Sequence, residues 1–212
     1  MIIKTFTFND FLENTYILYD DSKECIIVDP GCNSTDEKKE LTDFVSEHKL
    51  RPKKLINTHC HIDHILGNSF TAQKYNLTLA AHRGEVPVLE SGKQVSIMYG
   101  IPYTPSPEIK EFLQEGQEVV FGNTNLKILF TPGHSPASIC LYHEESQNLI
   151  AGDVLFQGSI GRTDLPGGNH ETLIRSIKNK LFILPNEVQV FPGHGESTTI
   201  GFEKKYNPFF NE

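Results

Sequence analysis

Residues 57–68 read NTHCHIDHILGN and place three histidines and an aspartate within six positions, directly after the apolar run KKLI at 53–56. A solvated loop does not need so many imidazoles, and a core cannot bury them without partners. At an extended strand end, residues two apart project the same way with Cα atoms ~6.6 Å apart, so His59 and His61 could converge on one metal ion. Cys60 then points to the opposite side. Asp63 and His64 follow where the chain turns into a helix.

Three more strand–turn junctions carry candidate ligands, each directly after a glycine that follows an apolar run. FTPGHS supplies His134, IAGDVL supplies Asp153, and VFPGHGE supplies His194. Glycine lets the backbone turn sharply at each of these points. A single such motif would be an ordinary turn or cap, but five histidines and two aspartates at matching junctions favour metal binding.

The number of candidate ligands indicates how many ions they hold. Seven ligands are too many for one tetrahedral zinc ion. Two divalent ions ~3.5–4 Å apart, sharing one carboxylate and one hydroxide, would each receive five ligands. The site would keep a net positive charge, which suits a small anionic substrate. Zinc is the first choice of metal, and iron and manganese are alternatives, because mixed histidine and aspartate sites accept all three.

Around these junctions the chain alternates between strand and helix patterns. Runs rich in β-branched and aromatic residues predict strands, and helices are expected at 34–50, 64–76 and 171–182. Strands are expected at 2–8, 15–20, 24–29, 53–58, 77–82, 117–122, 125–133, 137–145, 148–153 and 187–193. Residues 83–115 contain four prolines and three glycines, so we expect an irregular, partly helical excursion there. The two halves echo each other, which predicts two βα-rich halves in a sandwich with outer helices.

Composition narrows the class of protein. The 212 residues fit one large domain or two small ones, and the formal net charge of −8 argues against a nucleic-acid surface. No segment has the length and apolarity of a membrane span or signal peptide, so we expect a cytoplasmic protein without membrane contact. The four cysteines form no CxxC pair, and a disulfide framework is not expected. Monomer and homodimer both remain open.

The ordered motifs THCHIDH, TPGHS, AGDVLF and PGHG resemble those of the metallo-β-lactamase fold, and the resemblance covers nearly the whole chain. It implies an α/β protein built as a four-layer αββα sandwich in one domain, residues 1–212. His64, together with the run GDVLFQGSIGRTDLPGG, brings the resemblance closest to the single-domain glyoxalase II-like branch. Residue by residue, it implies His59, His61 and His134 on one metal, Asp63, His64 and His194 on the other, and Asp153 bridging the two.

Glyoxalase II-like enzymes of this fold hydrolyse hydroxyacylglutathione thioesters. The resemblance therefore implies attack by a metal-bridging hydroxide on a thioester such as S-D-lactoylglutathione, with Asp63 also orienting the hydroxide. A thiolate leaving group suits such a site, because a thiol pKa near ~8.5 makes protonation unnecessary. Two-domain relatives carry a helical C-terminal domain that contacts glutathione. Only 18 residues follow His194, so we expect no such domain here.

A second family of this fold offers different chemistry. Persulfide dioxygenases use one iron ion, and the matching ligands here would be His59, His134 and Asp153. They also resemble this chain around Arg162 and Asp164. A third reading, a metal-stabilised binding domain without catalysis, is less favoured, because it would need no open position for water.

Some residues carry two interpretations. Arg162 could bind a substrate carboxylate, with Asp164 positioning it, or the two could form an ion pair that fixes a glycine-rich loop. Tyr99 and Tyr103 could line the site if 83–115 forms a lid, although ordinary packing is the simpler expectation. The remaining histidines are expected at helix surfaces, turns or caps; they are His48, His82, His143 and His170.

Overall fold

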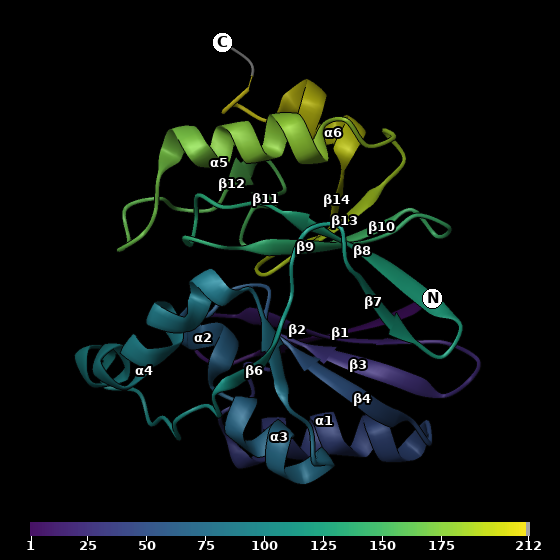
Figure 1. Cartoon of the computed structure of the whole chain (residues 1–212), viewed down its shortest axis with the longest axis vertical. Coiled ribbons are helices and arrows are strands. Elements are labelled where there is room, and N and C mark those ends of the chain that lie inside the picture. Colours follow the sequence, from purple (N-terminus) through teal and green to yellow (C-terminus); the bar gives the residue numbers. More distant parts are fainter. Residues whose placement is uncertain (211–212) are drawn as a thin grey trace. The chain divides into compact units, whose positions relative to one another are not determined.

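The structure is a computed structural model that describes residues 1–210. By the density of internal contacts these residues divide into two compact units. The first comprises Met1–Leu113 and Val120–Asn125, and the second comprises Gln114–Val119 and the residues from Leu126 onward. Two six-stranded sheets provide the frameworks of these units (Figure 1).

The first unit contains a sheet of order β1-β2-β3-β4-β5-β6 and four α-helices. Its elements are β1 (Ile2–Phe8), β2 (Glu13–Tyr19), β3 (Glu24–Val28), α1 (Thr35–Glu47), β4 (Arg51–Ile56), α2 (Ile62–Ile65), α3 (Asn68–Tyr75), β5 (Leu79–Ala81), the 3-10 turn η1 (Arg83–Glu85), α4 (Val86–Tyr99) and β6 (Ile109–Phe112). The strands from β3 to β6 pair in parallel. Their carboxyl ends therefore meet at one edge, where ligand sites of α/β sheets usually lie.

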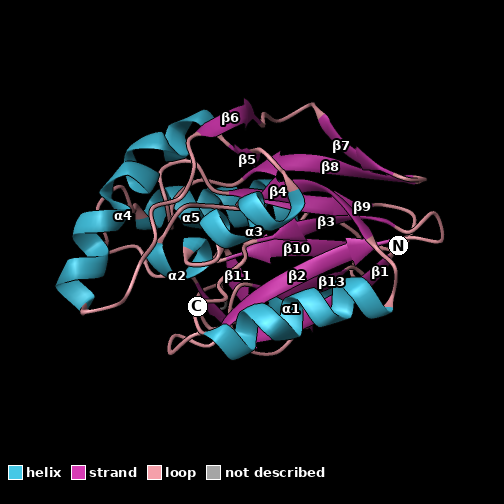
Figure 2. Ribbon diagram, turned by 90° about the horizontal axis from the view of Figure 1, so that it is seen from below, coloured by secondary structure: helices cyan, strands magenta, loops and turns pink. Residues whose placement is uncertain are grey.

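Helices α1 and α3 cover one face of this sheet. Leu41 and Val45 of α1 pack with Phe6 of β1 and Ile27 of β3, with Phe70 of α3 against the same cluster. Helix α1 begins with a capping box, in which the Ser34 side chain accepts from the N–H of Glu37 and the Glu37 carboxylate accepts from that of Ser34. Helix α4 lies at the opposite end of this unit from the N-terminus in both views (Figures 1 and 2).

The second unit is built on a sheet of order β14-β13-β10-β9-β8-β7. Except for Val120–Asn125, which belong to the first unit, its elements are β7 (Glu118–Phe121), β8 (Thr124–Phe130), β9 (Ile139–His143), β10 (Asn148–Gly152), β11 (Leu155–Phe156), β12 (Ser159–Ile160), α5 (His170–Ser176), the π-helical turn η2 (Ile177–Leu181), β13 (Gln189–Pro192), β14 (Thr198–Thr199) and α6 (Ile200–Tyr206). Strands β10 and β13 are parallel neighbours. Asp153 and His194 therefore follow two strands that end at the same edge.

The core of the second unit lies between this sheet and its helices. Leu173 of α5 and Ile200 of α6 pack with Leu149 of β10 and Val190 of β13, all of them buried. The predicted mixed α/β class with two sheets is confirmed. Within residues 1–210, no helix is long and apolar enough to cross a membrane.

Two local predictions differ from the structure. Residues 83–115 are more regular than expected, because Pro87 occupies the first turn of α4, where a missing N–H costs nothing. The predicted helix at 64–76 is broken at Gly67, where a Cβ would lie 2.6 Å from the sulfur of Cys32. The predicted helix at 171–182 is confirmed to within one residue at each end, although its second part, from Ile177, is a π turn. Helix α6 was not predicted at all.

Candidate metal centre

The histidine-rich stretch of the first unit forms a loop at the carboxyl end of β4. The strand ends at Ile56, so His59 and His61 lie in the loop and not on the strand end, and His61 immediately precedes α2. The imidazole centroids of His59 and His61 are 4.8 Å apart, and those of His59 and His64 are 4.2 Å apart. His59 and His64 are fully buried. The loop thus gathers three imidazoles closely.

A buried carboxylate orients the His64 ring. Oδ2 of Asp29, which follows β3, lies 3.3 Å from Nδ1 of His64. Asp29 also accepts hydrogen bonds from the Thr58 backbone N–H at 2.7 Å and from the Thr58 hydroxyl at 2.5 Å. With Nδ1 facing this carboxylate, Nε2 of His64 carries the lone pair, and it lies 3.6 Å from Oδ2 of Asp63. A metal-ligating histidine usually has such a carboxylate behind it.

A second buried acid lies behind the same ring. Oε1 of Glu13 is 3.9 Å from Nδ1 of His64, and Oε2 accepts a hydrogen bond from the Thr15 hydroxyl at 2.9 Å. Burial raises the pKa of Glu13 well above its usual range, which favours the neutral acid. The space for this side chain exists because residue 31 is glycine: a Cβ there would lie 2.0 Å from Glu13 Oε2.

Cys60 faces away from the imidazoles, as expected. Its side chain belongs to the apolar cluster that also contains Leu55 and Ile65. Its backbone N–H donates to Oε2 of Glu85 at 2.9 Å. Burial raises the pKa of the Cys60 thiol well above its usual range, so the thiolate that a metal would need is disfavoured.

In the second unit, two imidazoles converge on one carboxylate oxygen. Oδ2 of Asp153 lies 3.5 Å from Nε2 of His134 and 3.5 Å from Nε2 of His194. Two ligands bound at about 2.05 Å to one tetrahedral ion would be about 3.3 Å apart. The spacing is therefore long for hydrogen bonds and close to that of atoms that share a cation.

The glycine-rich run after β12 supports His134. Nδ1 of His134 lies 2.8 Å from the backbone carbonyl oxygen of Arg162, so this nitrogen carries the proton and Nε2 faces Asp153. The close approach requires glycine at 161, because a Cβ there would lie 1.9 Å from the carbonyl oxygen of Asp153 and 3.0 Å from Nδ1 of His134. The glycine-rich run therefore packs closely against both His134 and Asp153.

Arg162 and Asp164 form a bidentate ion pair on the surface. Nε of Arg162 donates to Oδ1 of Asp164 at 2.7 Å, and Nη2 donates to Oδ2 at 2.7 Å. These hydrogen bonds lower the pKa of Asp164 to about 2. The loop-fixing interpretation of Arg162 is thus present in the structure, and contact with a substrate anion stays a prediction.

The donor sets fit divalent metal ions. Ligand atoms of Asp29, His59 and His64 lie within 4.8 Å of one another, with Asp29 behind His64 and not among the predicted ligands. Imidazole nitrogens and carboxylate oxygens are the ligands of zinc, iron and manganese sites. The first unit brings together four predicted ligands, and the second brings together three; they are His59, His61, Asp63 and His64, and then His134, Asp153 and His194.

Several supporting residues escaped the sequence analysis. Asp29, Glu13 and Asn57 surround His64, and the Arg162 carbonyl orients His134. A usable signal existed for two of them, because Asp29 follows the apolar run CIIV and Asn57 follows KKLI directly. Glu13 carried no such signal, since it lies within a strand and is buried only by the fold.

Three of the four other histidines lie at helix ends or caps, as predicted, whereas His143 is the last residue of strand β9. His48 ends α1 and stacks on Phe44. His82 accepts from the Gly84 N–H and starts η1, and burial lowers its pKa. His143 lies 2.7 Å from the Ser146 hydroxyl, also with a pKa lowered by burial, and His170 is the first residue of α5.

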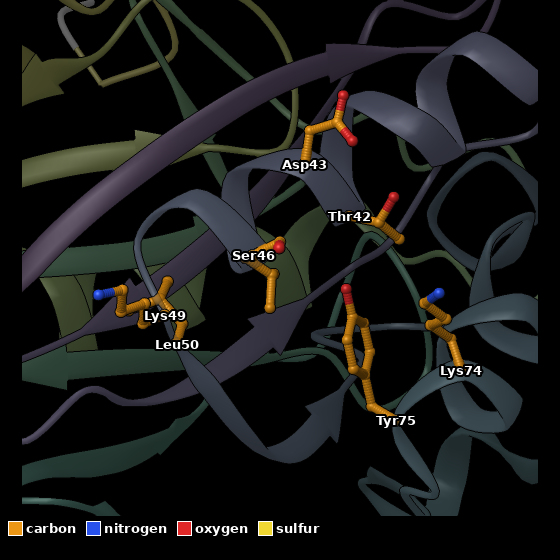
Figure 3. Close-up of a pocket in the computed structure, with 8 residues that line it drawn as sticks. Thr42, Asp43, Ser46, Lys49, Leu50, Lys74 and Tyr75 are labelled. Carbon is orange, nitrogen blue, oxygen red and sulfur yellow. The ribbon is translucent and has the colours of Figure 1, made fainter.

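Two hollows in the first unit lie outside the ligand cluster. One, of about 490 Å³, lies beside α1 and α3, and the sticks in Figure 3 show its lining residues, among them Lys49, Lys74 and Tyr75. The other, of about 340 Å³, lies between α4 and the segment before β6 and is lined in part by Tyr103. Tyr99 is exposed and contacts the Phe11 ring edge-on at 5.9 Å.

Comparison with known proteins gives one family and several relatives of similar length. The model of the Metallo-beta-lactamase superfamily matches residues 9–194. The probable metallo-hydrolase YqgX of Bacillus subtilis is 39% identical over 93% of this chain and 92% of its own. The hydroxyacylglutathione hydrolase GloC of Haemophilus influenzae is 37% identical over 95% of this chain and 94% of its own.

Solved structures are similar over the whole chain. The BLEG-1 B3 metallo-beta-lactamase has a TM-score of 0.91 at 35% identity and covers 100% of both chains. TTHA1623 in a di-iron-bound form has a TM-score of 0.87 at 32% identity and covers 99% of this chain and 100% of its own. ETHE1 from Myxococcus xanthus has a TM-score of 0.80 at 26% identity, with 98% and 84% covered.

Proposed function

The chain belongs to the metallo-beta-lactamase superfamily, and from that membership we propose that it is a dinuclear metallohydrolase of the glyoxalase II-like branch. Its substrate in this proposal is a small anionic acyl thioester such as S-D-lactoylglutathione. The observation that carries the proposal is the convergence of His134 and His194 on Asp153, each imidazole Nε2 being 3.5 Å from the same oxygen. The relative named hydroxyacylglutathione hydrolase supports the choice of substrate.

The ligand assignment follows the order of the motifs. In this proposal one ion is held by His59, His61 and His134, the other by Asp63, His64 and His194, and Asp153 bridges them. Support comes from each unit by itself: three imidazoles gather in the loop after β4, and a carboxylate joins two imidazoles in the second unit. Zinc, iron and manganese all suit this donor set, and a relative of this fold was solved in a di-iron-bound form.

The bound ions would supply Lewis acidity and lower the pKa of the attacking water to ~7. The side chains of the protein would orient the attacking water. Asp63 is partly exposed, with 14% of its side chain accessible, and its carboxylate would accept a hydrogen bond from that water and align it with the carbonyl carbon. A carbon–oxygen bond would form and the carbon–sulfur bond would break, and the leaving group could depart as the thiolate because thiols have pKa values near ~8.5. Of the two protons of the attacking water, one would end on the thiolate and the other would be released to solvent, so the products would be a carboxylate and a thiol.

Arg162 would attract the anionic end of the substrate. Its guanidinium is exposed and fixed by Asp164, so it is presented without a large loss of side-chain entropy. Because two of its nitrogens are already engaged by Asp164, this contribution is to substrate affinity and not to the bond-breaking step.

The test is thioester hydrolysis by protein of measured metal content. Loss of the S-D-lactoylglutathione thioester absorbance is followed for the wild type, His59→Ala and His170→Ala. His170 is exposed and lies outside the ligand set, so it is the matched histidine control. We expect hydrolysis by the wild type and His170→Ala and loss of at least 10²-fold in His59→Ala. A fully metallated wild type that leaves the thioester intact would refute this substrate.

The persulfide dioxygenase alternative has its own support in the similarity to ETHE1. Two histidines and one carboxylate, here His59, His134 and Asp153, would suffice for one iron ion. Oxygen uptake with glutathione persulfide distinguishes the two proposals, because the hydrolase needs no oxygen. Since one similar structure is named a B3 metallo-beta-lactamase, a chromogenic cephalosporin belongs in the same assay series, and its hydrolysis would replace the thioester as substrate.

A further inference from the structure

A chain of hydrogen bonds, partly buried at Tyr103 and Ser106 and buried at Asn57 and Asn68, links the segment after α4 to His64 within the first unit. The Tyr103 hydroxyl donates to Oγ of Ser106 at 3.0 Å, and the Ser106 N–H donates back to the Tyr103 oxygen at 2.9 Å. Nδ2 of Asn68 donates to Oγ of Ser106 at 3.2 Å and to Oδ1 of Asn57 at 2.7 Å. Nδ2 of Asn57 in turn donates to the backbone oxygen of His64 at 3.0 Å.

Asn57 stands at the centre of this chain. Besides the His64 backbone, its Nδ2 lies 3.3 Å from Oδ1 of Asp29, whose other oxygen faces the His64 ring. One amide group therefore holds both the main chain of His64 and the carboxylate that orients its imidazole. Asn57 and Asn68 are fully buried, so neither amide can exchange its partners for water.

Asn68 determines which way the Asn57 amide points. An amide presents an oxygen on one side and an NH₂ on the other, and the two orientations have nearly the same shape. Because Asn68 offers its NH₂ to Asn57, the oxygen of Asn57 must face Asn68, and its NH₂ must face His64 and Asp29. The Ser106 hydroxyl accepts a hydrogen bond from the same Asn68 nitrogen and donates one to the Ile65 carbonyl oxygen at 3.4 Å.

We propose that Asn68 and Ser106 are positioning residues for His64, acting through Asn57, and that they set the affinity of the metal ion that His64 binds. The inference rests on the proposed function in one respect, namely that His64 is a metal ligand. It makes the segment at 103–106 a part of the metal centre's support, although this segment is distant from the histidines in sequence. Residues that orient a ligand typically change metal affinity 10–100-fold when lost.

The experiment measures metal binding without turnover. The full chain is stripped with a chelator and titrated with Zn²⁺ against a chromophoric competitor, which yields two dissociation constants. His64→Ala identifies the constant that belongs to the His64 ion. We expect Asn68→Asp, which keeps the shape but loses the donor, to weaken that constant about 10-fold or more, and Ser106→Ala about 3-fold or more, with the other constant unchanged.

Two controls separate positioning from general damage. Thr104→Ala removes an exposed hydroxyl from the same segment and should leave both dissociation constants unchanged. Ser106→Thr keeps the hydroxyl and should therefore bind zinc as the wild type does. In a His64→Ala background, Ser106→Ala should add nothing further, as a double-mutant cycle requires. Thermal melting of the metal-free variants shows whether each is folded.

The outcomes are distinguishable. Equal weakening of both constants, the same loss in Thr104→Ala, or unchanged affinity in folded Asn68→Asp and Ser106→Ala would each overturn the positioning role. A wild type that binds zinc but hydrolyses no thioester would leave the inference standing and refute only the substrate. A wild type that binds no zinc, iron or manganese would overturn the proposed metal centre and this inference with it.

Discussion

Oδ2 of Asp29 lies 3.3 Å from Nδ1 of His64, and both side chains are buried. The two residues are far apart in sequence, and they meet because β3 and β4 are parallel neighbours that end at the same edge. The carboxylate favours the tautomer that carries its proton on Nδ1, which leaves Nε2 as the electron-pair donor. The backbone of Asp29 is in the left-handed region, with φ at +49°.

This contact predicts a specific effect of Asp29→Asn. The amide keeps the shape but loses the charge that orients the imidazole, so we expect zinc affinity to fall about 10-fold or more. Asp29→Ala should in addition lower the free energy of unfolding by about 1–3 kcal/mol, because the Thr58 N–H loses its acceptor. Zinc competition titrations and urea unfolding measure the two effects. Asp21→Asn, an exposed aspartate, is the control, and an equal loss of zinc affinity there would contradict the prediction.

Gly161→Ala should damage the second unit. The new methyl group would lie 1.9 Å from the Asp153 carbonyl oxygen, so the run that supports His134 must shift. We expect a loss of about 2–3 kcal/mol in the free energy of unfolding and weaker zinc binding. Gly158→Ala is the matched control: its φ of +64° makes alanine unfavourable by about 1–2 kcal/mol, but the space around it is open. Gly158→Ala should keep its zinc; equal zinc content in both variants would refute the expectation.

Asp20 should make the stability of the chain depend on pH in the acid range. Burial would raise the pKa of its carboxyl, but hydrogen bonds from Ser22, Asn123 and Thr124 outweigh burial and lower it. Because the folded pKa lies below the unfolded value of about 3.9, the contribution of Asp20 is present above that value and is lost as the pH falls through the folded pKa.

The variant Asp20→Ala tests this sign. Urea unfolding of metal-free protein should show a loss of about 1.5–3 kcal/mol at pH 7, since a buried charged acceptor is removed, and a smaller loss at pH 3. Asp21→Ala, the exposed neighbour, should change stability by less than about 0.5 kcal/mol at both values. A larger loss of unfolding free energy in Asp20→Ala at pH 3 than at pH 7 would contradict the lowered pKa of Asp20.

The thiols should be unreactive in the folded protein. All four cysteines are buried and free, and burial raises the pKa of Cys25, Cys32 and Cys140 to about 12 and that of Cys60 well above its usual range. The thiolate is the reactive form, so an aromatic disulfide reagent at pH 8 should modify none of the four until denaturant is added. A thiol that reacts within minutes in native buffer would show that its cluster opens readily.

The residue pattern predicted correctly those strands and helices whose cause lies in neighbouring residues of the chain. The strands around 2–8 and 24–28 and the helix at 35–47 follow from alternation, apolar spacing and a capping box that Ser34 and Glu37 form between themselves. Pattern failed at Gly67, because the reason for the break is the approach of Cys32 and Pro30, which are remote in the chain. It failed at α4 because four prolines were read as breakers, although Pro87 starts a helix.

The sequence by itself determined which chemistry the chain can carry: five histidines and two aspartates clustered after apolar runs, no CxxC pair, and a net negative charge. Those properties depend on residue type and on spacing along the chain. Only the tertiary structure decided which atoms of these residues are usable. The Asp29 carboxylate selects Nε2 of His64, the Arg162 carbonyl selects Nε2 of His134, and Asn57 holds His64 through an amide whose orientation Asn68 sets. Proton positions depend on partners brought together by folding, and spacing along the chain does not encode them.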